Sequence, residues 1–301
     1  MGKVVVMGVF VADAAFRAER TPRMGETVLG RGFVLGPGGK GSNQAVAAAR
    51  MGAEVHFLTR LGQDAFAEMA RGVWKQAGVA AHATPDPDSY TGAAFIYLDD
   101  ATGENAIIVS PGAAERISTA DAEAHADLIA GADVFMTQLE HPLAASAAAL
   151  RIARDAGVVT ILNPAPAADL PAEVLSLCDY VTPNETETEA LTGIAVSAID
   201  DADRACQRLC DLGVGTPIIT LGERGAYLHG HGLVPAVQAG AVVDTTGAGD
   251  AFNGGFAAAL TRGCDALAAV RVGCATAGLS VTRAGAAASM PDLAEVEALL
   301  N

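Results

Sequence analysis

Short runs of apolar, often β-branched residues alternate along this chain with longer stretches rich in alanine and leucine. The strands that this pattern predicts cover residues 4–9, 55–61, 134–138, 160–163, 180–182 and 217–221. Helical stretches lie between them, among them 142–156 and 199–212. Such alternation is typical of a mostly parallel sheet that is covered by helices on both faces. We therefore predict an α/β fold, a three-layer sandwich, with ligands bound at the carboxyl ends of the strands.

Two segments depart from this alternation. Residues 13–35 and 91–110 are strand-like, but no helical stretch separates their strands. In the second segment, a turn-forming sequence at 99–104 predicts a hairpin. No internal repeat and no low-complexity linker is visible. We predict a single domain over 1–301, in which 13–35 and 91–110 stand apart from a core made of 1–12, 36–90 and 111–301.

Composition restricts the possible partners. Of 301 residues, 51% are hydrophobic and 5% aromatic, which describes a globular protein with ample core. The formal net charge of −16 argues against nucleic acid and anionic membranes as partners. It does not argue against a small phosphorylated ligand, because a local cluster of N–H groups can bind phosphate on an acidic protein.

The cysteines and the first residues bear on the compartment. The chain has 5 cysteines, and an odd number in a chain of this length argues against a disulfide framework. Met1 is followed almost at once by the strand 4–9, without the pattern of a signal peptide. No apolar run is long enough to span a membrane. We expect a cytoplasmic protein.

The segment 244–256, DTTGAGDAFNGGF, carries the strongest chemical signal. Gly247, Ala248 and Gly249 lack bulky side chains, and a helix is expected at 252–260. Free N–H groups and the helix dipole would therefore favour an anion at this turn. Asp250 lies in the same turn, where a carboxylate could take a proton from an attacking hydroxyl. The alternative is a glycine-rich turn in which Asp250 caps the helix.

A second glycine-rich segment, 36–53, reads GPGGKGSNQAVAAARMGA. It is not a Walker A loop, because Lys40 is followed by Gly41 rather than by Ser or Thr, and its glycines do not fit the dinucleotide fingerprint. The turn would bring Lys40 and Asn43 to the start of a helix over 44–51, where both could hydrogen-bond a small polar ligand. The alternative is an ordinary strand–helix turn with a solvated lysine.

These two segments resemble the two signatures of the ribokinase-like (PfkB) family of sugar and nucleoside kinases. Further motifs follow in that family's order over nearly the whole chain: GET at 25–27, QLE at 138–140, NPAPA at 163–167, TPNETE at 182–187 and TLGERG at 220–225. NPAPA and TPNETE are typical of the family's ribokinase branch. The resemblance implies a small β-sheet lid over a sugar site, formed by 13–35 and 91–110, and a homodimer that forms through this lid.

The resemblance also implies a reaction in which ATP phosphorylates a sugar hydroxyl. Asp250 would be the general base, and the N–H groups of Gly247, Ala248 and Gly249 would hold the charge on the transferred phosphoryl group. The sugar would be bound by Asp13, Gly39, Lys40, Asn43 and Glu140, together with Asp250. For Asp13 the alternative is a cap after the first strand, and for Glu140 it is the first turn of the helix over 142–156.

Other positions would serve the nucleotide and the cations. Asn184 and Glu187 resemble the family's N-x-x-E motif, which orients the phosphates and Mg²⁺, with Glu187 acting through water. Their alternative is a solvated, acidic helix start. Thr220, Gly222 and Gly225 match positions near the nucleotide phosphates and ribose. The ligands that the resemblance implies for a monovalent cation, K⁺, are Asp244, Thr246, Val281, Ala284, Ala286 and Ser289.

Two positions depart from the family's pattern. Val11 stands two residues before Asp13, where ribokinases usually have Asn, and Ala114 stands where Asn is common. Loss of a hydrogen-bond partner in a buried site shifts preference toward a ligand that lacks the corresponding hydroxyl. We therefore predict phosphorylation of ribose or a closely related sugar. The alternatives are another substrate of the family (fructose, a deoxy sugar, a keto-deoxy sugar acid or a nucleoside) and a non-catalytic sugar- or nucleotide-binding regulator.

Overall fold

The structure is a computed structural model that describes residues 2–300. Its larger sheet is formed by β1 (Lys3–Met7), β4 (Glu54–Leu61), β5 (Ala80–Pro85), β8 (Val134–Thr137), β9 (Val159–Leu162), β10 (Tyr180–Val181), β11 (Thr216–Thr220), β12 (Gly225–Leu228) and β13 (Gly232–Pro235). The strand order is β13-β12-β11-β10-β9-β8-β1-β4-β5. Neighbours from β5 to β11 are parallel, and the hairpin β12–β13 completes one edge in antiparallel pairing.

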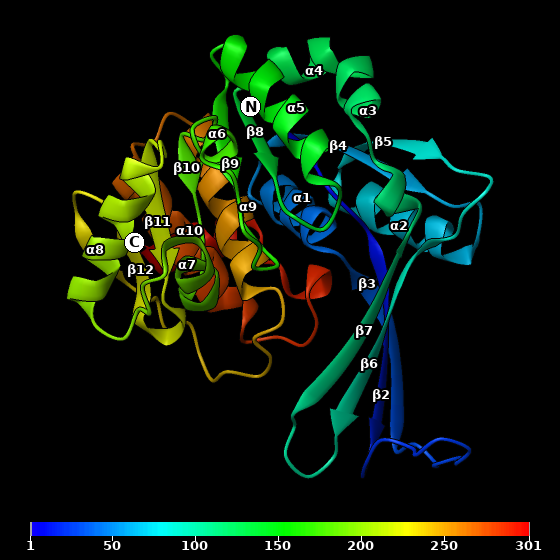
Figure 1. The fold of residues 1–301 in the computed structure, drawn as a ribbon. Helices are drawn as coiled ribbons and strands as arrows, with labels where there is room; N and C mark the ends of the chain where they lie inside the picture. Colours follow the sequence, from blue (N-terminus) through cyan, green and yellow to red (C-terminus); the bar gives the residue numbers. More distant parts are fainter. Residues whose placement is uncertain (1, 301) are drawn as a thin grey trace.

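Helices cover both faces of this sheet (Figure 1). One layer contains α1 (Lys40–Arg50), α2 (Ala65–Ala77), α9 (Ala248–Thr261), α10 (Ala266–Ser280) and α11 (Leu293–Leu300). The other contains α3 (Thr119–Ala124), α4 (Ala126–Ala130), α5 (Leu143–Asp155), α6 (Ala172–Leu175), α7 (Glu185–Thr192) and α8 (Ile199–Asp211). Three short 3₁₀ helices are η1 (Ala113–Arg116), η2 (Gly222–Arg224) and η3 (Ala287–Ser289). Among residues 2–300, no helix has both the length and the apolar character needed to cross a bilayer.

The first strand shows how the sequence builds these layers. Val4 and Val6 belong to the apolar cluster under α1 and α9, whereas Val5 and Met7 belong to the cluster under α5. Side chains of a strand alternate between the two faces, so an unbroken apolar run fits a strand that is covered on both sides. The predicted three-layer α/β sandwich is confirmed.

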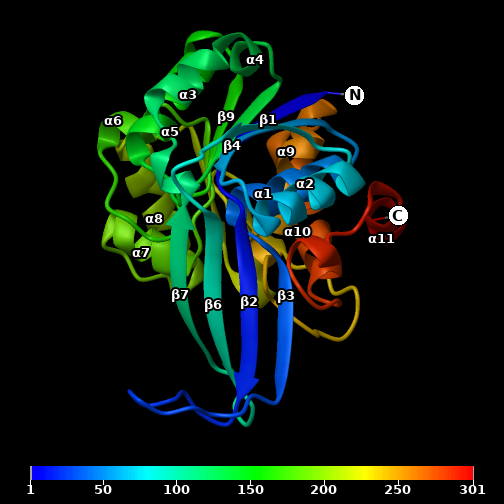
Figure 2. The ribbon, with the colours of Figure 1, turned by 90° about the vertical axis from the view of Figure 1, so that its right-hand side faces the viewer.

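A second, smaller sheet projects from the body as a long arm (Figure 1). It is formed by β2 (Val11–Ala18), β3 (Gly32–Gly38), β6 (Thr91–Asp99) and β7 (Asn105–Gly112), in the order β3-β2-β6-β7. Figure 2 shows these strands side by side. The predicted lid sheet is thus present, and β2, β3 and β7 extend beyond 13–35 and 91–110 by two or three residues at the ends near the core. We refer to this sheet as the lid.

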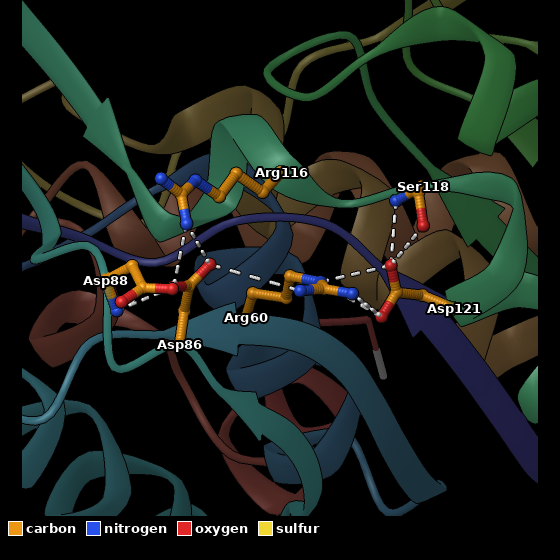
Figure 3. Close-up of polar contacts among 6 residues, drawn as sticks. All are labelled: Arg60, Asp86, Asp88, Arg116, Ser118 and Asp121. Atoms are coloured by element: carbon orange, nitrogen blue, oxygen red, sulfur yellow. Dashed lines mark hydrogen bonds and ion pairs between the residues drawn. The ribbon is translucent and has the colours of Figure 1, made fainter.

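An ion-pair network lies at the base of the lid (Figure 3). Asp86, which precedes β6, accepts hydrogen bonds from Arg116 at 3.0 and 3.3 Å. Arg60 of β4 lies 3.9 Å from Asp86 and donates from Nε to both oxygens of Asp121, at 3.0 and 3.1 Å. Asp121 also accepts from the N–H and hydroxyl of Ser118, each at 2.8 Å. The network therefore joins the chain entering β6 and the chain leaving β7 to the core.

Candidate active site

A cavity of about 660 Å³ lies at the carboxyl ends of the central strands. Asn163, Thr182 and Thr220, which end or follow β9, β10 and β11, line one side of it. The first turn of α9 lines another side, with Gly247, Ala248, Gly249 and Asp250. The cavity therefore lies where ligands bind in open α/β sheets.

The first turn of α9 exposes backbone N–H groups to this cavity. Gly247 is the N-cap and has φ 76°, a left-handed conformation that glycine adopts without strain. The N–H of Ala248 donates to the carbonyl of Thr245 at 3.2 Å. Within residues 2–300, the N–H groups of Gly247, Gly249 and Asp250 have no hydrogen-bond acceptor. The free donors of this turn are therefore these three N–H groups, whereas the Ala248 N–H is already bonded within the turn.

Asp250 does not cap α9, which has no side-chain cap. Its carboxylate is buried, with Oδ2 accepting from Nδ2 of Asn43 at 2.9 Å and Oδ1 from Nε2 of Gln44 at 3.0 Å. Burial raises the pKa of Asp250, and the Lys40 charge and these two amides oppose that rise. An ionised carboxylate with a raised pKa is suited to accept a proton near neutral pH.

Two further carboxyl groups share this environment. Burial and the charge of Asp250 raise the pKa of Asp13 to about 6. Burial raises the pKa of Glu140 to about 7, against the effect of Lys40. Asp13 lies within β2 rather than in a cap, and an oxygen of Glu140 accepts the backbone N–H of Lys40 at 2.7 Å. The structure thus brings Asp13, Glu140 and Asp250 into one charge-coupled group.

Lys40 is the cation of this group. Burial opposes the charged form of its ammonium, but the charges of Asp250, Glu140 and Glu187 outweigh burial and raise its pKa. Lys40 also lines the cavity, on the side of α1. The predicted alternative, a solvated lysine in an ordinary turn, is therefore not what the structure contains.

Two adjacent glycines shape the turn before α1. Gly39 is the N-cap of α1 with φ 86°, and a Cβ there would lie 2.6 Å from the carbonyl oxygen of Val9. A Cβ at Gly38 would lie 2.1 Å from a carboxylate oxygen of Asp13. Only glycine at these two positions lets the chain pass against Val9–Val11, between β1 and β2, and lets the Asp13 carboxylate lie against the turn.

Asn184 and Glu187 form the N-terminal capping box of α7. The side chain of Asn184 accepts the N–H of Glu187 at 2.9 Å, and Glu187 accepts the N–H of Asn184 at 2.9 Å. Both residues also line the cavity, and burial raises the pKa of Glu187. Glu187 is therefore part of a helix start, as in the alternative. Its carboxylate is not solvated, however, because Glu187 is buried and lines the cavity. Thr220, Gly222 and Gly225 line the same cavity.

Comparison with known proteins decides the family. Residues 1–293 match the sequence model of the family described as "pfkB family carbohydrate kinase". The chain belongs to this family. It is a kinase that transfers a phosphoryl group to a sugar hydroxyl, as the motifs predicted.

Individual relatives of the kinase agree with this assignment. It is 39% identical to a ribokinase of Haemophilus influenzae over 291 residues, which cover 96% of this chain and 95% of the relative. It is 34% identical to a deoxyribokinase of Salmonella typhimurium over 307 residues, covering 99% and 98%. The solved structure of Arabidopsis thaliana ribokinase complexed with ribose and ATP is 32% identical, with a TM-score of 0.91 and coverage of 100% of this chain and 99% of that one.

The segment expected to hold a monovalent cation adjoins the α9 turn of the kinase. Asp244 accepts the N–H of Thr246 and the N–H of Gly285, each at 2.9 Å, and so joins two loops. The N–H groups of Val243 and Asp244 donate to the carbonyl of Val281. Ser289 donates its hydroxyl to the carbonyl of Ala286 at 2.8 Å, and Ala284 is exposed nearby in sequence. In residues 2–300 no group of three or more His, Cys, Asp or Glu side chains could hold a metal ion, so carbonyl oxygens and water would have to supply most ligands.

Sequence reasoning missed several residues of the kinase site. Residues 236–240, which follow β13, line the cavity, as do Cys274 and Gly278 of α10. A Cβ at Gly278 would lie 2.0 Å from the carbonyl oxygen of Val237, so glycine allows this loop to pack on α10. Gln44 was also missed. It lies inside a helix, where local sequence gives no sign that its amide reaches Asp250.

Proposed function

We propose that this protein transfers the γ-phosphoryl group of ATP to ribose. The observation that carries the proposal is the position of Asp250. This buried carboxylate lies in the first turn of α9, next to the unpaired N–H groups of that turn, and its charge is coupled to the carboxyl groups of Asp13 and Glu140. The choice of ribose follows the ribokinase relatives and the ribokinase bound to ribose and ATP.

In the proposed reaction Asp250 accepts the proton of a sugar hydroxyl as that oxygen attacks the γ-phosphorus. The new O–P bond forms while the bond to the bridging oxygen of ADP breaks, which gives a sugar phosphate and ADP. The N–H groups of Gly247 and Gly249 stabilise the charge on the transferred group. The sugar hydroxyls are bound by Asp13, Gly39, Lys40, Asn43 and Glu140, and the nucleotide by Asn184, Thr220, Gly222 and Gly225.

Two cations belong to this proposal. Mg²⁺ neutralises charge on the phosphates, and Glu187 is placed to orient it through water because its carboxylate lines the cavity. K⁺ is assigned to the loops of Asp244, Thr246, Val281, Ala284, Ala286 and Ser289, beside the α9 turn. We expect K⁺ to stimulate turnover by ordering these loops. Equal turnover in potassium, sodium and choline buffers would contradict the proposed K⁺ site.

We keep 2-deoxyribose as a second candidate substrate on the basis of one specific observation. Val11 lies on the same face of β2 as Asp13, because side chains two apart share a face. Val11 and Ala114 both belong to one apolar cluster, with exposures of 5% and 1%. Both positions where an amide was expected are therefore occupied by buried apolar side chains, and a deoxyribokinase is among the relatives.

One assay separates the two substrates. ADP release is measured with MgATP and KCl over pentoses, deoxypentoses, hexoses, ketoses, sugar acids and nucleosides. The highest kcat/KM with ribose supports the first candidate and makes Val11 a tolerated change. A higher kcat/KM with 2-deoxyribose, reversed toward ribose in Val11→Asn, supports the second. Absence of ADP release from folded protein that binds ATP would overturn both.

We also propose that the protein is a homodimer that pairs through its lid. The lid carries exposed apolar side chains on all four of its strands, including Phe16, Phe33, Phe95 and Ile108. The ring of Phe16 lies 4.8 Å from that of Phe33 and 5.7 Å from that of Phe95. An exposed apolar surface of this kind is typical of an interface.

The proposed location is the cytoplasm. The 5 cysteines are free, and burial raises the pKa of Cys178, Cys206 and Cys274 to about 12, which keeps these thiols protonated. ATP as substrate and free thiols both fit a reducing compartment. Fractionation of the source cells checks the location.

A further inference from the structure

A chain of buried amides leads away from the general base. Nε2 of Gln138 donates to Oε1 of Gln44 at 2.6 Å. Nε2 of Gln44 donates at 3.0 Å both to Asp250 Oδ1 and to Asn163 Oδ1. Nδ2 of Asn163 donates to the carbonyl of Thr182 at 3.1 Å. Gln44 and Gln138 are 0% exposed, so neither side chain can touch a ligand in the cavity.

The partners of this chain determine the direction of each amide. A main-chain carbonyl can only accept, so Asn163 must direct its NH₂ at Thr182 and its oxygen at Gln44. The carboxylate of Asp250 also only accepts when ionised. Gln44 therefore faces two acceptors and must direct its NH₂ at both. Its oxygen is left for Gln138, which supplies the matching donor.

We propose that Gln44 is a positioning residue for the general base, and that Gln138 acts through Gln44 by fixing the direction of its amide. Adjacent residues of α1 hold the two oxygens of Asp250: Asn43 holds Oδ2 and Gln44 holds Oδ1. The carboxylate is thereby fixed in orientation and kept ionised where burial disfavours its charge. The proposal rests on the proposed role of Asp250 as the proton acceptor.

The direction in which the pKa of Asp250 moves follows from the hydrogen bond that Gln44 donates to its ionised carboxylate. A donor to a carboxylate favours ionisation and lowers its pKa. The other charged groups coupled to Asp250 are Lys40 of α1, Glu140 after β8, Asp13 of β2 and Glu187 of α7. None of these changes when Gln44 is replaced. Removing the Gln44 donor therefore raises the pKa of Asp250, and kcat is lost on the acidic side.

The test uses Gln44→Met, which keeps the length and approximate volume of the side chain without a donor. In the ligand-free protein, a ¹³C-carboxyl NMR titration follows the aspartate signal that is absent in Asp250→Asn. We expect its midpoint to move up by about one pH unit, or about 1.4 kcal/mol. With MgATP and ribose, the acidic limb of the kcat profile moves by the same amount, so kcat on that limb falls about tenfold. KM for ribose stays unchanged, because Gln44 does not contact the sugar.

Two further variants give controls. Gln138→Met moves the same midpoint by less, and the double variant equals Gln44→Met, because Gln138 acts only through Gln44. Ser42→Ala removes another buried hydrogen bond of α1, to Trp74, and leaves the midpoint in place. An unmoved NMR midpoint in Gln44→Met would overturn the inference. The NMR titration needs no turnover, so inactivity of the wild type toward every sugar would overturn only the proposed function.

Discussion

Asp250 is buried, Asp13 and Glu140 are partly buried, and removal from water raises the pKa of all three carboxyl groups. Their charges repel one another, and Lys40 with the amides of Asn43 and Gln44 offsets this repulsion. At the scale of single residues, the site therefore holds charge that is costly in the folded state. A sugar with several hydroxyl groups is suited to such a site, since each carboxylate can accept two or more hydrogen bonds.

Asp250→Asn tests the base directly. An amide cannot accept the proton of the sugar hydroxyl, so turnover should fall by at least ~100-fold. KM should change little, because the interaction belongs to the transition state. Steady-state kinetics measures both constants, and thermal unfolding confirms that the variant is folded. Turnover close to that of the wild type would show that another group takes the proton.

Glu140→Gln tests the raised pKa of Glu140 through the pH dependence of the free energy of unfolding. Folding raises the pKa of Glu140 from 4.5 to about 7, so the folded state binds the proton more tightly than the unfolded state. The resulting stability is complete below pH 4.5 and is lost as pH rises toward 7. For the ligand-free protein this is on the order of 3 kcal/mol. The variant should show a smaller fall in stability between pH 6 and 7 in urea titrations, while the contributions of Asp13 and Asp250, whose pKa values folding also raises, remain.

An unchanged slope between pH 6 and 7 in this variant would show that Glu140 ionises normally in the folded protein. Gln retains an oxygen that can accept the N–H of Lys40. The start of α1 should therefore stay intact, and any change in slope reports titration rather than loss of the helix start.

The candidate site residues that could be predicted from the sequence are those that belong to a local motif. Gly247, Asp250 and Lys40 lie in short glycine-rich segments whose backbone geometry is set by neighbours in the chain, so they could be found by pattern. Gln44 could not, because its partners Asn163 and Asp250 are 119 and 206 residues away. An isolated glutamine in a helix gives no sign of such contacts. The hydrogen bond from the Ala248 N–H to the Thr245 carbonyl could not be predicted either, because it depends on the geometry of the turn.

At the scale of elements, the site is built by α1 and α9, which pack closely. A Cβ on Gly254 of α9 would lie 2.4 Å from Cβ of Ala47, and 2.8 Å from both the Ala48 nitrogen and the Gln44 oxygen of α1. Two of these three atoms are backbone, which cannot turn aside as a side chain does. The short distance between the helices is what lets Asn43 and Gln44 reach Asp250.

Gly254→Ala should therefore separate the two helices. We expect a loss of stability of about 1–3 kcal/mol from overpacking. We also expect lower kcat, since both amides move away from Asp250. Gly72→Ala is the matched control, because Gly72 lies in α2 with no atom within 4 Å of the added Cβ. The control should be neutral or slightly stabilising. Equal stability and kcat in both variants would show that a methyl group at position 254 does not disturb the packing of α1 against α9.

The ends of the strands were predicted more accurately than the starts of the two helices of the site. The six predicted strands lie within two residues of β1, β4, β8, β9, β10 and β11, because apolar runs bounded by polar residues mark buried strands. Both helices of the site begin four residues earlier than predicted, at Lys40 and Ala248. Glycine lowers helix propensity, but here Gly41 lies in a buried first turn that packs against Gly8 and Gln138, and Gly249 lies in a first turn that lines the cavity. The edge strands β5 and β13 were not among the predicted strands, since partly exposed edge strands lack a continuous buried apolar run.

At the scale of the whole molecule, the proposed dimer depends on the lid. Phe33→Glu places a charge in the aromatic group of Phe16, Phe33 and Phe95. Burying that charge in an interface is unfavourable, so the variant should sediment as a monomer at concentrations where the wild type is a dimer. Leu233→Glu is the control, because Leu233 is an exposed apolar residue of β13, outside the lid. A wild-type monomer, or an unaffected dimer in Phe33→Glu, would contradict lid pairing.

The chain leaves the core for the lid twice, and each time it returns to the place where it left. After β1 the first excursion begins, and it ends at Gly39, whose Cβ position lies only 2.9 Å from Cα of Phe10. In the second, Thr91 pairs with Gly112 across β6 and β7, and Asp86 is bound to Arg116 just outside that pair. In topological terms the lid is two insertions into an otherwise continuous core. A single short linker at each point would close the chain after excision of the lid, so the layered core is a candidate for independent folding and exchange of lids between relatives.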